Sequence, residues 1–320
     1  MFREQRPILE MRNLTKQFVL EGGKKLTAVD HVSLELYSGQ SLGIVGESGC
    51  GKSTLAKMVA HLESVTSGNI LYKSRDITQL KGEALRQNRK TMQMIFQDPS
   101  ASFNPRMKIG DIVSEPLLNF KLMKQREVRV ETRKLLNMVG LPEDLINRYP
   151  HQLSGGQKQR ASIARALSLK PEILICDEAT SDLDVSIQAQ VVHLLVDLQK
   201  EKGFSYIFIG HDLALIRNIT HRIAVMYLGQ IVEIIDSEML TTEAVHPYTK
   251  ALLASVLSVQ QERNALIEII EGDPPSPSEL TSGCSFNSRC IERMRKCLRE
   301  KPGLKEIKID HLVACHLHSS

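Results

Sequence analysis

A glycine-rich stretch that ends in lysine and serine is the first part of this 320-residue chain that could do chemistry. Gly46 to Ser53 fits the pattern G-x-x-x-x-G-K-S/T, in which backbone N–H groups turn inward around phosphate oxygens. Lys52 is expected to reach the β- and γ-phosphates of a nucleotide, and Ser53 is expected to coordinate Mg²⁺. The other loop residues expected to hold the nucleotide are Gly46, Ser48, Gly49, Cys50, Gly51 and Thr54. Taken alone, the stretch could equally be a flexible glycine turn before a helix.

Polar side chains that directly follow apolar runs supply the other parts of a phosphoryl-transfer site. Asp177 is expected to hold Mg²⁺, and the adjacent Glu178 is expected to act as general base on the attacking water. His211 is expected to contact the γ-phosphate, and Gln97 is expected to contact the metal and the water. An isolated Asp-Glu pair is often a solvated turn, and a lone His or Gln at a strand end is usually structural. The hypothesis therefore rests on the whole set.

Apolar runs alternate with helical patterns along most of the chain, which predicts an α/β fold with a mainly parallel core sheet. The runs expected to be buried strands are 41–45, 92–96, 172–176 and 206–210, and the main helical patterns are 55–60, 83–90, 109–147, 154–169 and 187–200. Carboxyl ends of parallel strands meet at one edge of a sheet, which would bring the polar residues together. Residues 8–14 and 26–36 alternate like strands of an antiparallel sheet, with 15–25 as a loop that carries Phe18.

The composition is that of a soluble globular protein, with 42% hydrophobic residues, 24% charged residues and a net charge of +4. This charge is too small to indicate nucleic-acid binding by itself. No apolar run approaches the roughly 20 residues that span a bilayer, and the N-terminus lacks the apolar core of a signal peptide. We therefore expect a cytosolic chain whose membrane role, if any, comes through partner proteins.

The pentapeptide Leu153-Ser154-Gly155-Gly156-Gln157 gives the set a context. With it, residues 8–258 resemble the ATP-binding subunits of ABC transporters, in which this pentapeptide is the signature. The motifs also come in the order of that family: the phosphate loop, Gln97, the signature, the Asp177-Glu178 pair and His211. The resemblance implies a P-loop NTPase fold with an antiparallel β subdomain and a helical signature subdomain. It also implies that two ATP molecules are sandwiched between two ATPase subunits, each signature contacting the ATP of the other protomer. On the same ground, Phe18 would stack on adenine.

Three local motifs resemble the oligopeptide/dipeptide importer ATPases within that family. They are Gln97 to Arg106 (QDPSASFNPR), Tyr149 to Gln152 (YPHQ) and His246 to Thr249 (HPYT). The Arg106 form resembles the second of two paralogous ATPases, which implies a heterodimer. The resemblance further implies two integral-membrane permeases, an extracytoplasmic binding protein, no nucleic acid, and a peripheral position on the cytoplasmic face of the inner membrane. Nickel, glutathione and sugar importers share these motifs, so the solute stays open.

The last part of the chain, 259–320, resembles the C-terminal extension of the same branch. Four of the six cysteines lie there, namely Cys284, Cys290, Cys297 and Cys315, after the proline-rich stretch 272–278. Four thiolates could bind a 4Fe–4S cluster or Zn²⁺, and their wide spacing favours iron–sulfur. The alternative is four free thiols in a loose tail.

Two other classes of protein compete with the importer ATPase. A soluble ABC ATPase that acts on nucleic acid or the ribosome usually has two cassettes in one chain or a long coiled-coil insertion, and neither is present here. A regulatory or metal-sensing protein would not need an intact hydrolytic set, whereas Glu178 and His211 are both present. A homodimer and a heterodimer are both open alternatives.

Overall fold

The computed structural model describes residues 5–179, 183–260, 275 and 282–318. The chain divides into two compact units, one formed by residues 1–79 with 208–320 and the other by residues 80–207. Residues 180–182, which follow shortly after the Asp-Glu pair, and most of the proline-rich stretch 272–278 lie outside the described residues. Among the helices that are described, none is both long and apolar enough to cross a membrane.

A four-stranded antiparallel sheet lies in the first unit, in the order β2-β1-β4-β5. Its strands are β1 (Leu9–Val19), β2 (Lys25–Leu36), β4 (Ser67–Tyr72) and β5 (Arg75–Asp76). The expected antiparallel sheet is thus confirmed, but the expected loop over 15–25 is wrong for its first half. Register shifts at Leu14 and Lys16 break the alternation of β1, so the strand continues to Val19 without a regular sequence pattern.

The first unit also holds strands in the order β11-β12-β10-β9-β3-β8. They are β3 (Ser41–Val45), β8 (Ser205–Gly210, which begins in the second unit), β9 (Arg222–Tyr227), β10 (Gln230–Asp236), β11 (Lys305–Lys308) and β12 (His311–Val313). β3 is parallel to β9, whereas β10 and the two strands of the tail pair antiparallel. All five residues of β3 are buried, because apolar side chains cover both of its faces.

Helices of the first unit are α1 (Lys52–Val59), α8 (Leu213–Ile219), α9 (Leu240–Glu243) and α10 (Pro247–Gln260). α8 packs directly on β3, and a Cβ atom on Gly43 would lie 2.4 Å from Cγ2 of Ile216. The tail strand β12 continues the sheet next to β10 through the pairs Glu233↔Val313 and Ile234↔Leu312. The C-terminal segment is therefore built into the first unit, a feature that the sequence analysis does not anticipate.

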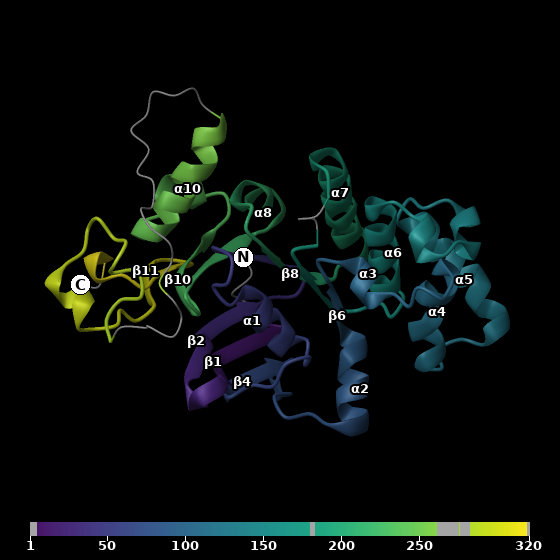
Figure 1. The fold of residues 1–320 in the computed structure, drawn as a ribbon, viewed down its shortest axis with the longest axis horizontal. Coiled ribbons are helices and arrows are strands. Elements are labelled where there is room, and N and C mark those ends of the chain that lie inside the picture. Colours follow the sequence, from purple (N-terminus) through teal and green to yellow (C-terminus); the bar gives the residue numbers. More distant parts are fainter. Residues whose placement is uncertain (1–4, 180–182, 261–274, 276–281, 319–320) are drawn as a thin grey trace. The chain divides into compact units, whose positions relative to one another are not determined.

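The second unit contains the parallel pair β6 (Met92–Ile95) and β7 (Ile173–Asp177) and a group of helices. The helices are α2 (Gly82–Thr91), α3 (Pro99–Ser102), α4 (Ile109–Asn119), α5 (Gln125–Met138), α6 (Gly155–Leu167) and α7 (Val185–Lys202). α4, α5 and α6 pack on one another and form the helical group that the resemblance implies (Figure 1). The helical pattern over 109–147 is interrupted at Phe120, where α4 ends.

Candidate nucleotide-binding site

Two glycines of the predicted phosphate loop, Gly46 and Gly51, are required by close backbone contacts. Gly51 precedes α1 with φ 106°, and a Cβ atom there would lie 2.1 Å from the carbonyl oxygen of Ala28. A Cβ atom on Gly46 would lie 2.1 Å from the carbonyl oxygen of Met226. Neither position can carry a side chain without moving the neighbouring backbone. The loop is thus held tightly between β2 and β9, with the N-terminus of α1 at its end, an arrangement that suits phosphate oxygens.

Lys52 is the first residue of α1 and is 97% buried, with an exposed fraction of only 3%. Its Nζ atom donates hydrogen bonds to the carbonyl oxygens of Gly46 (2.8 Å) and Glu47 (2.9 Å), so the loop curls around the ammonium group. Ser53 and Thr54 follow in the first helical turn and are half-buried. Burial raises the pKa of the Cys50 thiol, although nearby Lys52 opposes the shift, so Cys50 is a neutral packing residue at neutral pH.

Three predicted residues of the second unit lie at adjacent strand ends. β6 and β7 are parallel and pair Ile95 with Cys176, so Gln97 and Glu178 each follow the paired residue by two positions. Asp177 is buried at the end of β7, and Glu178 is half-buried with φ 47°. A positive φ costs a non-glycine residue of order 1–3 kcal/mol and occurs preferentially at functional sites. The strain at Glu178 is an observation that supports a role in chemistry.

The signature pentapeptide forms the start of α6. Ser154 is the N-cap residue, and its hydroxyl accepts from the Gln157 N–H (3.3 Å) while the Gln157 side chain accepts from the Ser154 N–H (3.0 Å). Gly156 is buried, and a Cβ atom there would lie 2.6 Å from Cγ2 of Ile187. Ser154 and Gly155 are exposed. This capping box fixes an exposed helix N-terminus that can meet an anionic group.

The remaining predicted residues lie in the first unit. His211 is exposed between β8 and α8, where Asp212 caps the helix by accepting from the Leu215 N–H (3.0 Å). Phe18 is half-buried near the end of β1, and the Lys16 ammonium lies 4.9 Å from its ring centroid. Phe18 is therefore a strand residue and no loop residue, with a cation against its ring.

The predicted site residues are thus divided between the two units. The phosphate loop, Phe18 and His211 belong to the first unit, and Gln97, the signature, Asp177 and Glu178 belong to the second. Within each unit the structure brings the expected residues to strand ends or helix starts. Their union in a single site stays a prediction, which we take up below.

The sequence analysis missed two contacts to Glu47 of the phosphate loop, one from Arg289 of the tail and one from Tyr248 of α10. Arg289 forms two parallel hydrogen bonds to the Glu47 carboxylate, Nη1–Oε2 at 2.8 Å and Nη2–Oε1 at 3.0 Å. The Tyr248 hydroxyl accepts from the Glu47 N–H at 2.9 Å. No local pattern indicates a contact across 242 positions, since Glu47 occupies an unconstrained position of the motif.

A buried polar cluster attaches β12 to the rest of the unit. The Glu233 side chain has no exposed area and contacts His311 Nε2 at 2.7 Å through Oε1, which also accepts from the Val245 N–H at 2.9 Å. Burial raises the pKa of Glu233, but hydrogen bonds with His311 and its other partners outweigh burial and hold the pKa below its usual value. His246 is buried beside this cluster, and its Nδ1 accepts from the Tyr248 N–H at 3.1 Å.

We expect the stability of the first unit to fall on mild acidification because of His246. Burial lowers the pKa of this imidazole from 6.5 to about 4, against the opposing influence of Glu233. Between these two values the unfolded chain carries a proton that the folded chain lacks, so the free energy of unfolding rises with pH in this window. A change from pH 7 to pH 5 should therefore cost about 2 kcal/mol.

Thermal unfolding at pH 5 and pH 7, for the parent chain and for His246→Asn, checks this prediction. Asparagine keeps an acceptor for the Tyr248 N–H but does not titrate. The parent should lose several degrees of Tm at pH 5, and the variant should lose clearly less. Equal losses in both chains would assign the acid sensitivity to other groups.

The four tail cysteines all line one small pocket, together with His246 and Phe286. Burial raises the pKa of Cys284 to about 11 and also raises the pKa of Cys290 and Cys315, so these thiols are neutral at pH 7. The pocket has a volume of about 10 Å³, which is room for roughly one water molecule and too small for a four-iron cluster. In the described part of the chain, no three His, Cys, Asp or Glu side chains are arranged to hold a metal ion. The expected iron–sulfur or zinc site is not supported by this arrangement.

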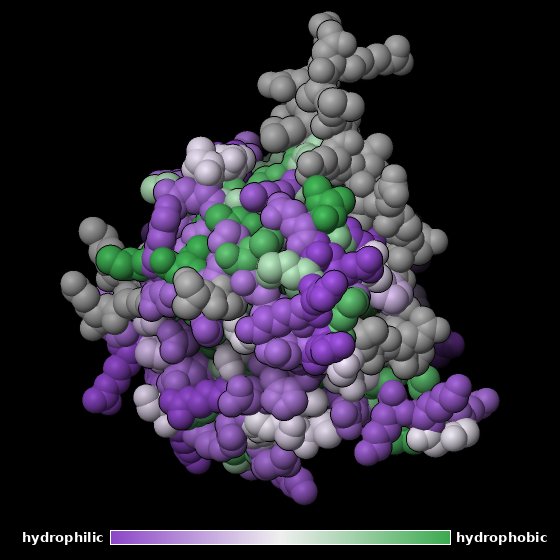
Figure 2. Space-filling model, turned by 90° about the vertical axis from the view of Figure 1, so that its left-hand side faces the viewer, coloured by the Kyte–Doolittle hydropathy of each residue, from purple (hydrophilic) through white to green (hydrophobic). Residues whose placement is uncertain are grey.

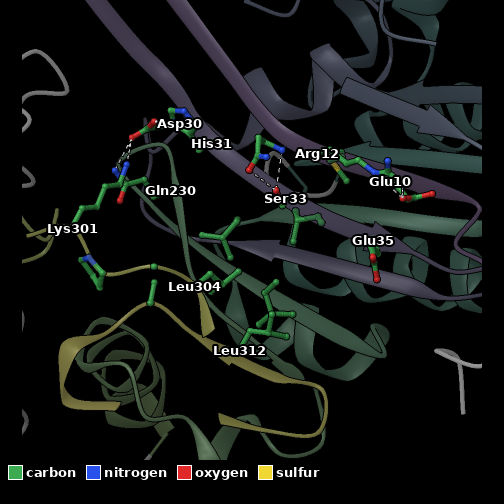
Figure 3. A pocket seen from close by; sticks show the side chains of 18 of the residues that line it. Glu10, Arg12, Asp30, His31, Ser33, Glu35, Gln230, Lys301, Leu304 and Leu312 are labelled. Carbon is green, nitrogen blue, oxygen red and sulfur yellow. Dashed lines mark hydrogen bonds and ion pairs between the residues drawn. The ribbon is translucent and has the colours of Figure 1, made fainter. Parts of the chain in front are cut away.

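A larger pocket of about 750 Å³ lies where β1 and β2 face β10 and the tail segment Lys301 to Leu304 (Figure 3). Charged residues of β1, β2 and the tail line this pocket together with apolar residues of β10 and β12. None of its lining residues belongs to the predicted nucleotide site. The pocket marks a second place where the tail approaches the nucleotide-binding part of the unit.

The tail also contributes to the surface of the molecule. Figure 2 shows the side on which the tail lies in Figure 1, and this face is mainly hydrophilic with separate apolar areas. Large apolar side chains of the tail that are exposed include Ile291, Leu298 and Ile309. Scattered apolar side chains are ordinary on protein surfaces, so we assign no partner to this face.

Comparison with known families gives two matches along the chain. The family described as ABC transporter matches residues 29–181. The family described as oligopeptide/dipeptide transporter, C-terminal region, matches residues 232–297. The first match contains the phosphate loop, the signature and the Asp-Glu pair, and the second contains the tail segment up to Cys297.

Two curated relatives match almost the entire chain. The oligopeptide transport ATP-binding protein OppF of Salmonella typhimurium is 47% identical over 325 residues, which cover 98% of this chain and 97% of that protein. The oligopeptide transport ATP-binding protein AppF of Bacillus subtilis is 44% identical over 324 residues, which cover 98% of each. Among solved structures, the ATP-binding cassette MJ0796, a dimer in a post-hydrolysis state bound to ADP and Pi, is 30% identical with a TM-score of 0.66, covering 72% of this chain and 98% of that one.

Proposed function

Because this chain belongs to the ATP-binding subunits of ABC transporters, in the branch with the oligopeptide/dipeptide C-terminal region, we propose that it hydrolyses ATP to power the import of short peptides. The observation that carries the proposal is the phosphate loop, in which Gly46 and Gly51 leave no room for side chains and the lysine is buried at a helix start. Such a cradle suits a nucleoside triphosphate. The choice of short peptides as the transported solute rests on the names of the relatives, which are oligopeptide transport ATP-binding proteins.

The hydrolytic roles follow from the chemistry of each side chain. Lys52 would leave the carbonyl oxygens it now contacts, or share them, to bind the β- and γ-phosphates. Glu178 would accept a proton from the attacking water, whose oxygen bonds to the γ-phosphorus while the bond to the ADP oxygen breaks. Ser53, Gln97 and Asp177 would hold Mg²⁺, which neutralises charge on the phosphates when bound. His211 would contact the γ-phosphate.

Hydrolysis would require two ATPase subunits. The exposed, capped start of α6 at Ser154, Gly155, Gly156 and Gln157 would donate to the ATP held by the partner subunit's phosphate loop. Phe18 would stack on adenine, since an aromatic ring on a strand offers a flat apolar face. The dimeric state of the related cassette MJ0796 supports this arrangement. The partner would be a paralogous subunit, in keeping with the Arg106 motif.

The same proposal assigns partners and a location. The subunit would sit peripherally at the cytoplasmic face of the inner membrane, under two integral-membrane permeases that receive solute from a binding protein. ATP binding and hydrolysis would belong to residues 8–258, and residues 259–320 would form the C-terminal extension. The motifs shared with nickel and glutathione importers make these solutes the alternative cargo.

Co-purification from detergent-solubilised membranes tests the assembly. A tagged chain should bring down two polytopic permeases and a second ATPase, each identified by mass spectrometry. The Lys52→Ala chain should bring down the same partners, because the change is confined to the nucleotide-binding loop. Recovery with ribosomes or nucleic acid and without permeases would favour the soluble ABC ATPase instead.

A metal in the tail is a separate proposal, and it rests on the four thiols that share one pocket. Metal binding would need the thiols to lose their protons and a four-iron cluster would need the pocket to widen, so its fit is poor. We expect anaerobically purified protein to contain iron and sulfide in equal amounts if a cluster forms, and zinc alone if a single ion binds. Loss of the metal in Cys290→Ser would place it at this pocket, and absence of iron, sulfide and zinc would end the proposal.

A further inference from the structure

Glu47 places a negatively charged carboxylate in a loop that is proposed to bind negatively charged phosphates. A polyanion bound there would be repelled by an uncompensated negative charge. The structure compensates this charge with Arg289, whose guanidinium meets the carboxylate in a bidentate pair at 2.8 and 3.0 Å. The Arg289 side chain is only 7% exposed and that of Glu47 is 24% exposed, so solvent screens the pair weakly.

Aromatic packing holds Arg289 in this position. Phe286, three residues earlier, packs against Tyr227 and Tyr248 with ring centroids 5.2 and 5.4 Å apart. The Tyr248 hydroxyl accepts from the Glu47 N–H, so the same cluster also contacts the loop backbone. The Arg289 Nη1 further lies 3.5 Å from the Tyr227 hydroxyl. The tail residues 286–289 and the phosphate loop are therefore one packed region.

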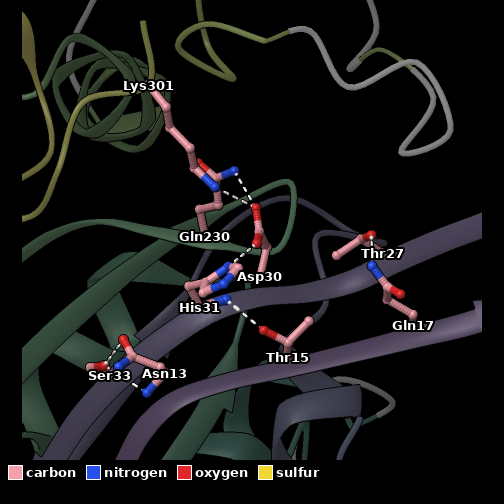
Figure 4. A network of polar contacts seen from close by, with 9 residues as sticks. All are labelled: Asn13, Thr15, Gln17, Thr27, Asp30, His31, Ser33, Gln230 and Lys301. Atoms are coloured by element: carbon pink, nitrogen blue, oxygen red, sulfur yellow. Dashed lines mark hydrogen bonds and ion pairs between the residues drawn. The ribbon is translucent and has the colours of Figure 1, made fainter. Parts of the chain in front are cut away.

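A second tail cation, Lys301, contacts Asp30 of β2 (Figure 4). Lys301 and Gln230 both contact the Asp30 carboxylate. The Asp30 N–H donates to the Gly229 carbonyl (2.8 Å), and the Gly229 N–H donates to the Cys50 carbonyl (2.8 Å). Lys301 is 42% exposed, so its ion pair should contribute far less than that of Arg289.

We propose that Arg289 of the C-terminal extension is a positioning residue for the nucleotide site, because it neutralises Glu47 and thereby lets the phosphate loop accept ATP. The inference rests on the proposed function. It makes the extension part of the ATP site of its own subunit. Losing the guanidinium should weaken ATP binding mainly through the charge of Glu47, and removing that charge should restore binding.

Binding of a fluorescent ATP analogue to the purified full-length chain tests this inference. Arg289→Ala should raise the Kd roughly tenfold at low salt, and this deficit should shrink at high salt. The double variant Arg289→Ala/Glu47→Gln should recover most of the affinity. ATPase assays should show a raised KM with kcat within about twofold of the parent.

Controls separate this role from simple anchoring of the tail. Arg295→Ala, an exposed cation in the same segment, should leave the Kd unchanged, and Lys301→Ala should change it less than about twofold. Arg289→Gln keeps part of the aliphatic chain and a polar end, and it replaces Arg289→Ala if the alanine variant does not fold. Each variant's Tm is measured without nucleotide.

Either of two results overturns the inference. One is parent-like affinity in Arg289→Ala. The other is a weakened Arg289→Ala that Glu47→Gln fails to restore, which would mean that Arg289 only anchors the tail. A parent chain that binds no nucleotide would instead overturn the proposed function, so the two failures are distinguishable.

Discussion

Glu178→Gln should reduce ATP hydrolysis by about 10²–10⁴-fold and leave ATP binding nearly unchanged. The glutamine side chain has almost the same shape but cannot accept the proton that the attacking water must lose. Glu178 directly follows Asp177 at the end of β7 and holds a strained positive φ of 47°. Steady-state phosphate release and equilibrium binding of a fluorescent ATP analogue, measured on the same preparations, check both halves of the prediction.

The matched control is Glu172→Gln, which makes the same change just before the other end of β7. It should hydrolyse ATP at the parent rate. With ATP present, Glu178→Gln mixed with the paralogous ATPase should also accumulate as a closed dimer, which size-exclusion chromatography detects. Unchanged turnover in Glu178→Gln would refute its role as general base.

Lys52→Ala should weaken ATP binding by at least about a hundredfold. A buried ammonium group attracts phosphate oxygens more strongly than an exposed ammonium group does, because less solvent screens the two charges. Lys52 is 3% exposed and is enclosed by loop carbonyl oxygens. The loop from Gly46 to Thr54 contains no other lysine or arginine that could take its place. Lys57→Ala, an exposed lysine of the same helix, should bind ATP normally. Isothermal titration with MgATP measures both, and tight binding by Lys52→Ala would contradict the loop assignment.

The glycines give an independent test of the same loop. Gly51→Ala places a methyl group 2.1 Å from a backbone carbonyl at φ 106°, so it should disrupt nucleotide binding or folding. Gly49→Ala has the strain of φ 77° but meets no atom within 4 Å, so it should have the smaller effect. The larger effect is expected at Gly51 because only there would the added methyl group clash with a neighbouring atom.

Local motifs and apolar runs were enough to predict the phosphate loop and the strand ends. The run 41–45 is buried on both faces, and a run of that kind is readable without knowing its neighbours. The N-cap role of Ser154 likewise follows from residues three positions apart. Local sequence patterns of this type predict the parts of the site that lie within a single strand, loop or helix.

Features that depend on distant partners could not be predicted in this way. β1 extends to Val19 through register shifts against β2, so Phe18 lies on a strand where a loop is expected. The tail strand β12 pairs with β10 over a separation that no periodicity reveals. The Arg289–Glu47 pair joins a tail residue to an unconstrained loop position, and only the folded chain brings them together.

The cysteines show what a sequence pattern leaves out. Their number and spacing favour a metal site, and all four do line one pocket. The pocket is nevertheless almost filled by packed side chains, and burial raises the pKa of Cys284, Cys290 and Cys315. A donor set read from the sequence indicates which atoms are available, but it does not indicate how much space they enclose.

Uptake of a labelled tripeptide tests the central claim most directly, in cells that lack this gene and carry either the parent or the Glu178→Gln copy. Nickel and glutathione uptake are measured in parallel. We predict that the parent restores peptide uptake, that Glu178→Gln does not, and that nickel and glutathione uptake are the same in both strains. Peptide uptake that is equal with the two copies would contradict the claim that hydrolysis at this subunit powers peptide import.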